Sequence, residues 1–383
     1  MKIVFDASGM AVRSYTKAGV YRYGMELLRH LPAHLEENEQ LELFFNFFRQ
    51  RHVARMRETI ELVGGLAARC SRMHPRLVRA LKVSVERRIG EHQVFHGPFD
   101  RLQHTRNSAR VLTIHDLAFL RSPSGLPKSW IDELTATVPD SAKRAHRIIT
   151  ASEFSKSDIV EWLRIPAERV KVIQHGVAPN LKPSPDTLID QKILSELYGV
   201  QPNFILYLGT LQPNKNIENL CTAYQELRRD GWEGQLVLAG NEGWLFDEMW
   251  QRICDQGNDQ GVVRTGFVAE EDISRLYGCC TCFALVSVLE GFGIPVVEAM
   301  ACGAPVVVAD SCSLPEVAGG LAEIVDPWNP RSIAEGLDRA INLGADRADR
   351  TRRGIEHAKT FTWDKSAAAH MSVYREANAE VGS

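Results

Sequence analysis

The chain has 383 residues, 44% of them hydrophobic and 24% charged, which suits a globular protein with two domains of about 180 residues each. Its formal net charge of −3 and its pI near 6.5 exclude a general attraction to nucleic acid. Met1–Asp6 lacks the apolar segment of a signal peptide, and no run approaches the roughly eighteen residues of a membrane helix, so we expect a cytoplasmic protein with free thiols.

Short apolar runs alternate with helical stretches along the whole chain, a pattern typical of parallel sheets covered by helices. In the first half we predict strands at Lys2–Phe5, Leu41–Phe47, Val94–Phe95, Val111–Ile114, Arg147–Thr150 and Val170–Ile173. In the second half we predict strands at Phe204–Leu208, Gln235–Ala239, Val262–Arg264, Phe283–Val286, Pro305–Ala309 and Ala322–Val325. Each set would build one doubly wound α/β domain. The polar, proline-rich segment after Gly176 marks the seam, which gives an N-terminal domain over residues 1–178 and a C-terminal domain over residues 179–361.

The first loop of the chain contains Gly19, in the run Ser14-Tyr-Thr-Lys-Ala-Gly-Val20, directly before a predicted helix. The loop has no Gly-x-Gly-x-x-Gly pattern, so nothing supports a nicotinamide or flavin site. A plain turn glycine is one interpretation, and close approach of the backbone to a ligand is the other.

A basic segment lies between Phe48 and Ile89, where eleven Lys and Arg residues stand against three Glu. Apolar residues such as Leu62, Leu77 and Leu81 are interleaved with them. One interpretation is a solvated helical face. The other is a basic amphipathic surface that docks on an anionic membrane leaflet.

Two polar side chains follow predicted strands, at the edge where open α/β sheets bind ligands. His115 lies in Thr113-Ile-His-Asp-Leu117, and Lys215 lies in Leu208-Gly-Thr-Leu-Gln-Pro-Asn-Lys-Asn216. A lone histidine is often a buried structural residue, as we expect for His96 and His175, and a lone lysine is often a solvated turn residue. A lysine in this loop can also reach a diphosphate and neutralise its charge.

The most informative run is Glu290-Gly-Phe-Gly-Ile-Pro-Val-Val-Glu298. Pro295 suits the first helical position, so Gly293 and Ile294 are predicted at a helix start, where free amides and the helix dipole favour phosphate. Glu290 would precede this site and Glu298 would lie about two turns inside the helix. The spacing alone leaves a purely structural strand–turn–helix open.

The only tight cysteine cluster is Cys279-Cys-Thr-Cys282. No second Cys or His pair follows at the spacing of a zinc site, and Cys282 opens an apolar strand. We therefore expect buried thiols there and no bound metal.

The wider run Val286–Asp310, followed by Ser313-Leu-Pro-Glu-Val-Ala-Gly319, resembles the donor-site signature of retaining glycosyltransferases of family 4. The likeness extends, less densely, from Met1 to about Trp363. It implies the GT-B fold, in which two Rossmann-like doubly wound domains face a central cleft. The last helix, at about residues 362–379, would cross back to the first domain.

The resemblance also implies roles for individual residues. Lys215 would bind the donor diphosphate, His115 would contact the donor sugar, and Glu290 would face the sugar hydroxyls and the reacting carbon; these three are the predicted catalytic residues. Glu298 would accept both ribose hydroxyls. The remaining donor-binding residues would be Gly19, Gly266, Phe267, Val268, Gly291, Phe292, Gly293 and Ile294.

The chain departs from the family pattern at two positions. Many relatives carry arginines where this chain has Thr210 and Asn214, which leaves Lys215 as the only usual cationic ligand. Arg13 or Lys17 would be the replacement.

We therefore expect a retaining glycosyltransferase that needs neither metal nor cofactor and moves a hexose from a nucleoside diphosphate sugar to a sugar hydroxyl. Mannose from GDP-mannose is favoured because Glu290–Pro295 and Gly243-Trp-Leu245 are similar to mannosyltransferase members, although guanosine and uridine are not distinguished. The expected partners are a lipid-linked or oligosaccharide acceptor of cell-surface polysaccharide biosynthesis and, through residues 48–89, the inner face of the cytoplasmic membrane. A sugar-nucleotide epimerase of the same fold and an inactive nucleotide-sugar-binding protein stay open as alternatives.

Overall fold

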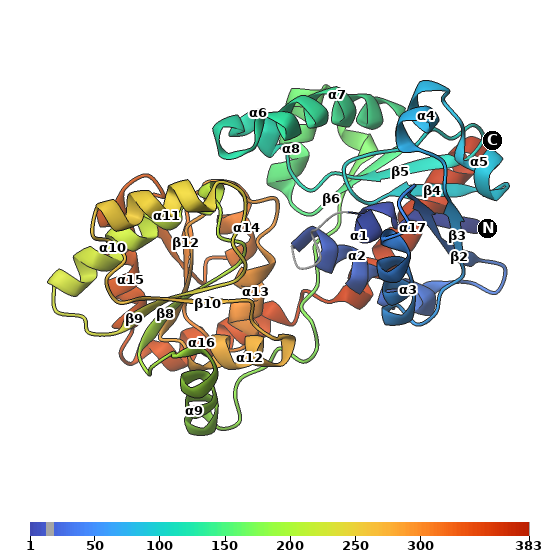
Figure 1. Ribbon diagram of the computed structural model, residues 1–383. Helices are drawn as coiled ribbons and strands as arrows, with labels where there is room; N and C mark the ends of the chain where they lie inside the picture. Colours follow the sequence, from blue (N-terminus) through green and yellow to red (C-terminus); the bar gives the residue numbers. More distant parts are fainter. Residues whose placement is uncertain (13–18, 383) are drawn as a thin grey trace. The chain divides into compact units, whose positions relative to one another are not determined.

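The structure, a computed structural model, describes residues 1–12 and 19–382, and the chain divides into two units (Figure 1). Unit 1 consists of Met1–Leu117, Asp132–Gly176 and Trp363–Ser383, and unit 2 of Ala118–Ile131 and Val177–Thr362. Each unit is built on one parallel sheet. No described helix is both long and apolar enough to cross a lipid bilayer.

Unit 1 contains a seven-stranded sheet in the order β3-β2-β1-β4-β5-β6-β7. Its strands are β1 (Lys2–Asp6), β2 (Gln40–Asn46), β3 (Ala68–Ser71), β4 (Val94–Gly97), β5 (Ala109–Thr113), β6 (Arg147–Thr150) and β7 (Val170–Val172). Its helices are α1 (Ser8–Val12), α2 (Gly19–His30), η1 (Leu31–His34), α3 (His52–Leu62), α4 (Pro75–Ala80), α5 (Val85–Ile89), most of α7 (Lys128–Arg144), α8 (Glu153–Leu163), η3 (Ala167–Arg169) and α17 (Trp363–Gly382). The strand order reverses between β1 and β4, so the sheet is doubly wound.

Unit 2 contains a six-stranded parallel sheet in the order β10-β9-β8-β11-β12-β13, which reverses between β8 and β11. Its strands are β8 (Phe204–Leu208), β9 (Gln235–Ala239), β10 (Val262–Gly266), β11 (Cys282–Leu285), β12 (Val306–Ala309) and β13 (Glu323–Val325). Its helices are α6 (Ala118–Arg121), η2 (Pro123–Gly125), α9 (Thr187–Tyr198), η4 (Pro213–Lys215), α10 (Ile217–Arg229), α11 (Phe246–Asp255), α12 (Glu270–Cys279), α13 (Ile294–Ala301), α14 (Leu314–Ala318), α15 (Pro330–Ile341) and α16 (Asp346–Ala358). On one side α10 packs against α11 and α15, and elsewhere α12 packs against α9 and α13.

All twelve predicted strands are present. They could be predicted because runs such as Val306–Ala309 are buried on both faces of a parallel sheet and are therefore apolar in the sequence. The structure adds one strand that the sequence did not predict, β3. It is a short edge strand whose residues Ala68, Arg69 and Cys70 are exposed, so it lacks the apolar signal. The interpretation of residues 48–89 as one helical face is therefore wrong, since β3 separates α3 from α4.

The segment Ala118–Ile131 belongs to unit 2, although the sequence assigned it to the first domain. The indole nitrogen of Trp244 donates a hydrogen bond to the carbonyl oxygen of Gly125 at 2.6 Å, and the rings of Trp130 and Trp244 lie 5.1 Å apart. These contacts hold the segment to the loop after β9.

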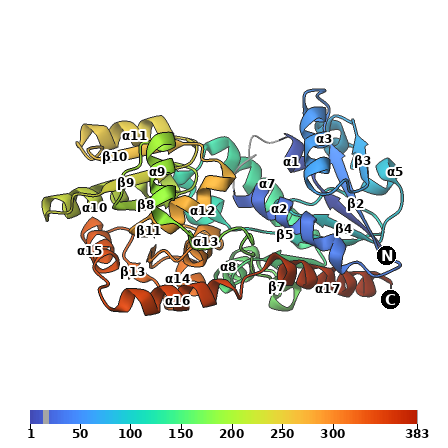
Figure 2. The same cartoon turned by 90° about the horizontal axis from the view of Figure 1, so that it is seen from below.

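The C-terminal helix α17 packs against β5 and α2 of unit 1 (Figure 2). A buried chain of hydrogen bonds joins them: Tyr374 hydroxyl to His96 Nδ1 (2.8 Å), His96 Nε2 to Thr113 hydroxyl (2.8 Å), Thr113 to Tyr23 hydroxyl (2.9 Å) and Tyr23 to His370 Nε2 (2.9 Å). His370 Nδ1 lies 2.7 Å from the carbonyl oxygen of Ser366, which can only accept. Because burial lowers the pKa of His370 to about 4 and that of His96 well below its usual value, both rings are neutral at pH 7. Nε2 of His370 then accepts from Tyr23, and the hydrogen bonds run in one direction from Tyr374 to His370.

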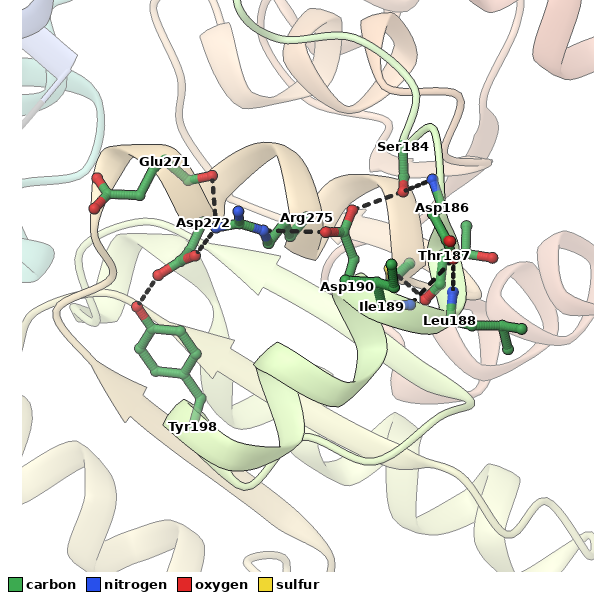
Figure 3. A network of polar contacts seen from close by, with 11 residues as sticks. Ser184, Asp186, Thr187, Leu188, Ile189, Asp190, Tyr198, Glu271, Asp272 and Arg275 are labelled. Atoms are coloured by element: carbon green, nitrogen blue, oxygen red, sulfur yellow. Dashed lines mark hydrogen bonds and ion pairs between the residues drawn. The ribbon is translucent and has the colours of Figure 1, made fainter.

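Polar contacts also fix α9 against α12 in unit 2 (Figure 3). Arg275 pairs with Asp190 at 3.1 Å and with Asp272, and the Tyr198 hydroxyl donates to Asp272 at 2.7 Å. Asp186 caps the start of α9 by accepting from the amides of residues 188 and 189.

Candidate active site

Two predicted catalytic residues meet in unit 2, at the point where the strand order reverses. Lys215 lies in the loop after β8, and Glu290 lies in the loop after the neighbouring strand β11. The Nζ atom of Lys215 is 2.6 Å from Oε1 of Glu290, with the side chains 18% and 14% exposed. The carboxyl ends of strands at such a reversal are where open α/β sheets bind ligands.

Hydrogen bonds hold the loop of Glu290 in place. The hydroxyl of Ser287 donates to Oε1 of Glu290 at 2.8 Å. The hydroxyl of Ser313 lies 3.0 Å from the carbonyl oxygens of both Glu290 and Phe292. Ser287 and Ser313 are fully buried, so the carboxylate is presented by a rigid loop.

The loop after β8 is joined directly to this loop. The amide of Val288 donates to the carbonyl oxygen of Asn214 at 3.1 Å, and Nδ2 of Asn216 donates to the carbonyl oxygen of Val286 at 3.0 Å. The positions of the missing family arginines therefore lie in a loop that supports the site. Arg13 and Lys17, the suggested replacements, lie outside the described residues.

Helix α13 begins at Ile294, as predicted, directly after Gly293. Gly293 has a φ of +94°, and a Cβ atom there would lie 2.7 Å from Cδ2 of Leu314, so both conformation and space require glycine. Glu298 lies about one turn inside the helix, not two, because α13 starts only four residues before it. It is 1% exposed and accepts a hydrogen bond from the Tyr277 hydroxyl at 3.1 Å.

Other predicted donor-binding residues lie in loops of the same unit. Gly266 ends β10 with a φ of +67°, Phe267 is 49% exposed and Val268 is buried. Gly291 and Phe292 lie between Glu290 and α13, and the ring of Phe292 is buried 5.8 Å from that of Phe361. Phe292 thus packs in the core, whereas Phe267 offers an accessible ring.

Strand β8, which precedes the loop of Lys215, is buried along most of its length. Tyr207 on β8 is fully buried, and its hydroxyl donates to the carbonyl oxygen of Thr210 at 2.9 Å. Burial, aided by the nearby negative charge of Glu290, raises the pKa of Tyr207 well above its usual value. Tyr207 therefore stays neutral and leaves Lys215 and Glu290 as the charged groups paired at this position.

In unit 1, His115 follows β5 and is partly exposed. Its Nε2 atom lies 3.0 Å from the carbonyl oxygen of Pro98, its amide donates to Asp100 at 3.0 Å, and its ring packs edge-on to Tyr23. Since the carbonyl oxygen of Pro98 can only accept, Nε2 carries a proton, and in the neutral ring Nδ1 would hold a lone pair that can accept from a hydroxyl.

The neighbouring histidines of unit 1 are buried. Burial lowers the pKa of His96 and of His175 well below the usual value, and lowers that of His370 to about 4.

Gly19 opens α2, and a Cβ atom there would have no atom within 4 Å among the described neighbours, so crowding does not require this glycine.

Among residues 1–12 and 19–382, no group of three or more His, Cys, Asp or Glu side chains lies close enough to hold a metal ion. Cys279, Cys280 and Cys282 are buried free thiols. Burial raises the pKa of Cys282 to about 12, which disfavours the thiolate that a metal would need.

Comparison with known proteins identifies the family of the chain. Residues 19–181 match the family described as Glycosyltransferase Family 4, and residues 192–357 match Glycosyl transferases group 1. The chain is 31% identical over 387 residues to the O-antigen chain mannosyltransferase B of Escherichia coli, covering 98% of this chain and 100% of that protein. The chain belongs to glycosyltransferase family 4.

Further likenesses concern parts of this glycosyltransferase or its fold alone. The serotype-specific mannosyltransferase WbdA of E. coli is 28% identical over 237 residues, which cover 60% of this chain but 28% of WbdA. The crystal structure of Anabaena HepE in complex with UDP-glucose has a TM-score of 0.74 at 21% identity, covering 97% of this chain and 100% of that one. Sucrose-phosphate synthase from Thermosynechococcus elongatus has a TM-score of 0.74 at 18% identity, over 99% of this chain and 100% of that one. The fold is therefore GT-B.

Sequence reasoning missed several residues that position the site of this glycosyltransferase. Ser287 and Ser313 lie within the motif that carries the family resemblance, so their place in the signature was a signal. No sequence signal marked Tyr277 and Asn216, because their contacts with Glu298 and Val286 depend on how separate elements pack.

Proposed function

We propose that the protein is a retaining mannosyltransferase, which transfers mannose from GDP-mannose to a sugar hydroxyl of a lipid-linked oligosaccharide during cell-surface polysaccharide biosynthesis. The observation that carries the proposal is the Lys215–Glu290 pair, at 2.6 Å, where β8 and β11 end. The names of the two E. coli relatives, an O-antigen chain mannosyltransferase and a serotype-specific mannosyltransferase, support the choice of sugar and setting.

The donor diphosphate would bind by replacing Glu290 as the ion-pair partner of Lys215. A diphosphate carries more negative charge than Glu290, so it would draw the Lys215 ammonium to itself and leave the Glu290 carboxylate facing the sugar. Lys215 and the amides at the start of α13 would stabilise the leaving diphosphate, which is the task a divalent ion performs in other transferases. Glu290 would stabilise the positive charge that develops on the reacting carbon.

The remaining roles follow the geometry of each unit. Glu298 would hold the ribose hydroxyls, after its hydrogen bond from Tyr277 rearranges. The lone pair on Nδ1 of His115 would accept from a hydroxyl of the donor sugar.

The test uses the purified full chain with GDP-mannose, UDP-glucose and a panel of lipid-linked and oligosaccharide acceptors, with products followed by mass spectrometry and NMR. We expect a mannosylated product that retains the α configuration and forms in the presence of a chelator. An inverted product, or activity lost to chelator and restored by a divalent ion, contradicts the proposal. Conversion of donor alone would favour an epimerase, and donor binding without turnover would favour a binding protein.

We also propose that residues 48–81 of unit 1 dock on an anionic membrane surface, which would make the enzyme a peripheral protein of the inner leaflet. Five large apolar side chains are exposed in this region: Phe48 (58%), Leu62 (45%), Met73 (37%), Leu77 (56%) and Leu81 (69%). Exposed basic residues, including Arg49, Arg51 and Arg72, accompany them. Apolar side chains that insert beside cations that bind anionic headgroups are typical of interfacial surfaces.

Not every basic residue of the segment takes part. Arg69 pairs with Glu42 at 2.8 Å, and Arg88 lies over the ring of Phe44 and donates to Gln103. The proposed docking surface therefore contains fewer of the basic residues between Phe48 and Ile89 than the sequence indicated.

Co-sedimentation with phosphatidylglycerol vesicles tests this surface. The double variant Leu77→Glu/Leu81→Glu should lose vesicle binding and keep donor binding. The matched control is Leu188→Glu, which changes an even more exposed leucine on α9 of unit 2 (78%) and should leave vesicle binding intact. Unchanged co-sedimentation of the double variant would return this region to a solvated surface.

A further inference from the structure

A basic hollow lies at the amino ends of the strands of unit 1, opposite the end that carries His115. Its volume is about 360 Å³. It is formed by the starts of β5 and β6, the end of α7, η3 and the last turns of α17, and it is lined by Arg110, Lys143, Arg144, Ala145, His146, Arg147, Arg169 and Glu380.

Two hydrogen-bond donors face each other inside this hollow. The amide of Arg110 donates to Nδ1 of His146 at 2.8 Å, so in the neutral ring Nδ1 holds the lone pair and Nε2 carries the proton. Nε2 lies 3.0 Å from Nη2 of Arg110, which is also a donor. Neither group can accept from the other. An oxygen atom that accepts from both would satisfy the arrangement.

The positive charge of the hollow is only partly balanced. Arg147 pairs with Glu380 at 2.6 Å and with Glu376 at 3.7 Å, and Arg144 pairs with Asp140 at 2.8 Å. Arg110 Nε donates to the carbonyl oxygen of Arg144 at 2.6 Å, and Arg169 donates to the carbonyl oxygens of residues 142, 143 and 145.

The end of α7 explains only part of this cluster. The C-terminus of a helix carries a partial negative charge equivalent to about half an elementary charge, which favours nearby cations. The hollow has five cationic side chains, and three paired carboxylates together with about half a charge at the helix end do not balance them, so a positive excess remains. Burial and the charge of Arg110 lower the pKa of His146, and burial and the charge of Arg144 lower that of Arg110.

We infer that this hollow is a binding site for a phosphate-bearing anion, whose oxygen atoms accept from Nε2 of His146 and Nη2 of Arg110 while Lys143 and Arg169 supply charge. Planar guanidinium groups donate to phosphate oxygens in pairs, and the volume suits one or two phosphoryl groups. The site is distinct from the proposed donor site, because the hollow lies at the amino ends of β5 and β6, whereas His115 follows the carboxyl end of β5. A free phosphate compound and a phospholipid headgroup present the same chemistry.

Calorimetry of the full chain with inorganic phosphate and with inorganic diphosphate tests the site, in a Lys215→Ala background that weakens binding at the proposed donor site. We expect saturable binding that becomes about tenfold weaker in His146→Asn, because one charge-assisted hydrogen bond is lost. Asparagine keeps an acceptor for the Arg110 amide, so the fold should persist, as a circular dichroism melt would verify. Lys143→Glu, at an exposed position, should weaken binding at least as much.

The matched control is Arg331→Gln, which removes one cation from a surface ion-pair cluster of unit 2 and should not change the phosphate affinity. A parallel arm measures co-sedimentation of Lys143→Glu with phosphatidylglycerol and phosphatidylcholine vesicles. A specific loss on phosphatidylglycerol assigns the site to a lipid headgroup, and unchanged vesicle binding assigns it to a free anion. If neither phosphate, diphosphate nor vesicle binding depends on His146 and Lys143, the site does not exist, whatever the outcome at Lys215.

Discussion

The carboxyl ends of the two sheets carry opposite kinds of chemistry. In unit 2 the residues there are charged and paired, with Lys215 and Glu290 in contact and Glu298 buried nearby in the same motif. In unit 1 the buried groups that pack around His115 are uncharged: Tyr23 and His175 lie against its ring, and Tyr23 belongs to the hydrogen-bonded chain to α17. The difference indicates a division of labour, in which unit 2 would hold the charged donor and unit 1 would present neutral groups to hydroxyls.

Replacing the cation of unit 2 should have the largest effect. Lys215→Ala should lower kcat/KM by about a thousandfold, because the lysine stabilises the leaving diphosphate as well as holding it in the ground state. Donor affinity should fall too, which calorimetry with GDP-mannose would show. A variant with near-normal kcat/KM would mean that the charged end of unit 2 does not carry the reaction.

The buried histidine His370 of unit 1 should make the free energy of unfolding depend on pH. The pKa of His370 is about 4 in the folded protein against 6.5 when unfolded, so the unfolded state binds more protons as pH falls below 6.5. The contribution of His370 to the free energy of unfolding is fully present above pH 6.5 and is lost as the pH falls toward 4. Between pH 7 and pH 5 the loss is on the order of 2 kcal/mol.

Urea unfolding at pH 7 and pH 5 measures this loss. His370→Gln retains an acceptor for the Tyr23 hydroxyl but does not titrate, so its free energy of unfolding should fall less between the two pH values than that of the wild type. Equal losses in the two proteins would show that His370 does not set the acid sensitivity of unit 1.

The smallest effect is expected at the buried carboxylate of unit 2. Glu298→Gln should weaken donor binding about tenfold, since a charge-assisted hydrogen bond to ribose becomes a neutral one. Turnover at saturating donor should change little, because this contact is equally strong in the ground and transition states. A large loss of kcat with unchanged donor affinity would reverse the roles of the two glutamates.

Much of the fold could be predicted from the sequence, because the strands of both sheets are apolar runs bounded by turns. The edge strand β3 could not, since Arg69 and Cys70 are exposed and carry no apolar pattern. The site was predicted only in part. The motif identified Glu290 and the loop identified Lys215, but their contact spans 75 residues and exists because β8 lies beside β11.

The chain of hydrogen bonds from Tyr374 to Tyr23 could not be predicted from the sequence for the same reason. His96 and Tyr374 are 278 residues apart, and no local pattern marks a histidine that accepts from a distant tyrosine. The sequence predicted that His96 is structural, which its full burial confirms, but the packing of α17 was needed to supply its partners.

The most direct test of the central claim is Glu290→Gln, assayed for donor binding by calorimetry and for turnover by steady-state kinetics. Glu335→Gln, at an exposed position of α15 in unit 2, is the matched control for loss of one carboxylate. We predict that Glu290→Gln lowers kcat by about a hundredfold or more while donor affinity changes only a few-fold, because Glu290 acts on charge that develops in the transition state. Near-normal turnover of Glu290→Gln would contradict the assignment of the Lys215–Glu290 pair to catalysis and would leave unit 2 as a donor-binding unit.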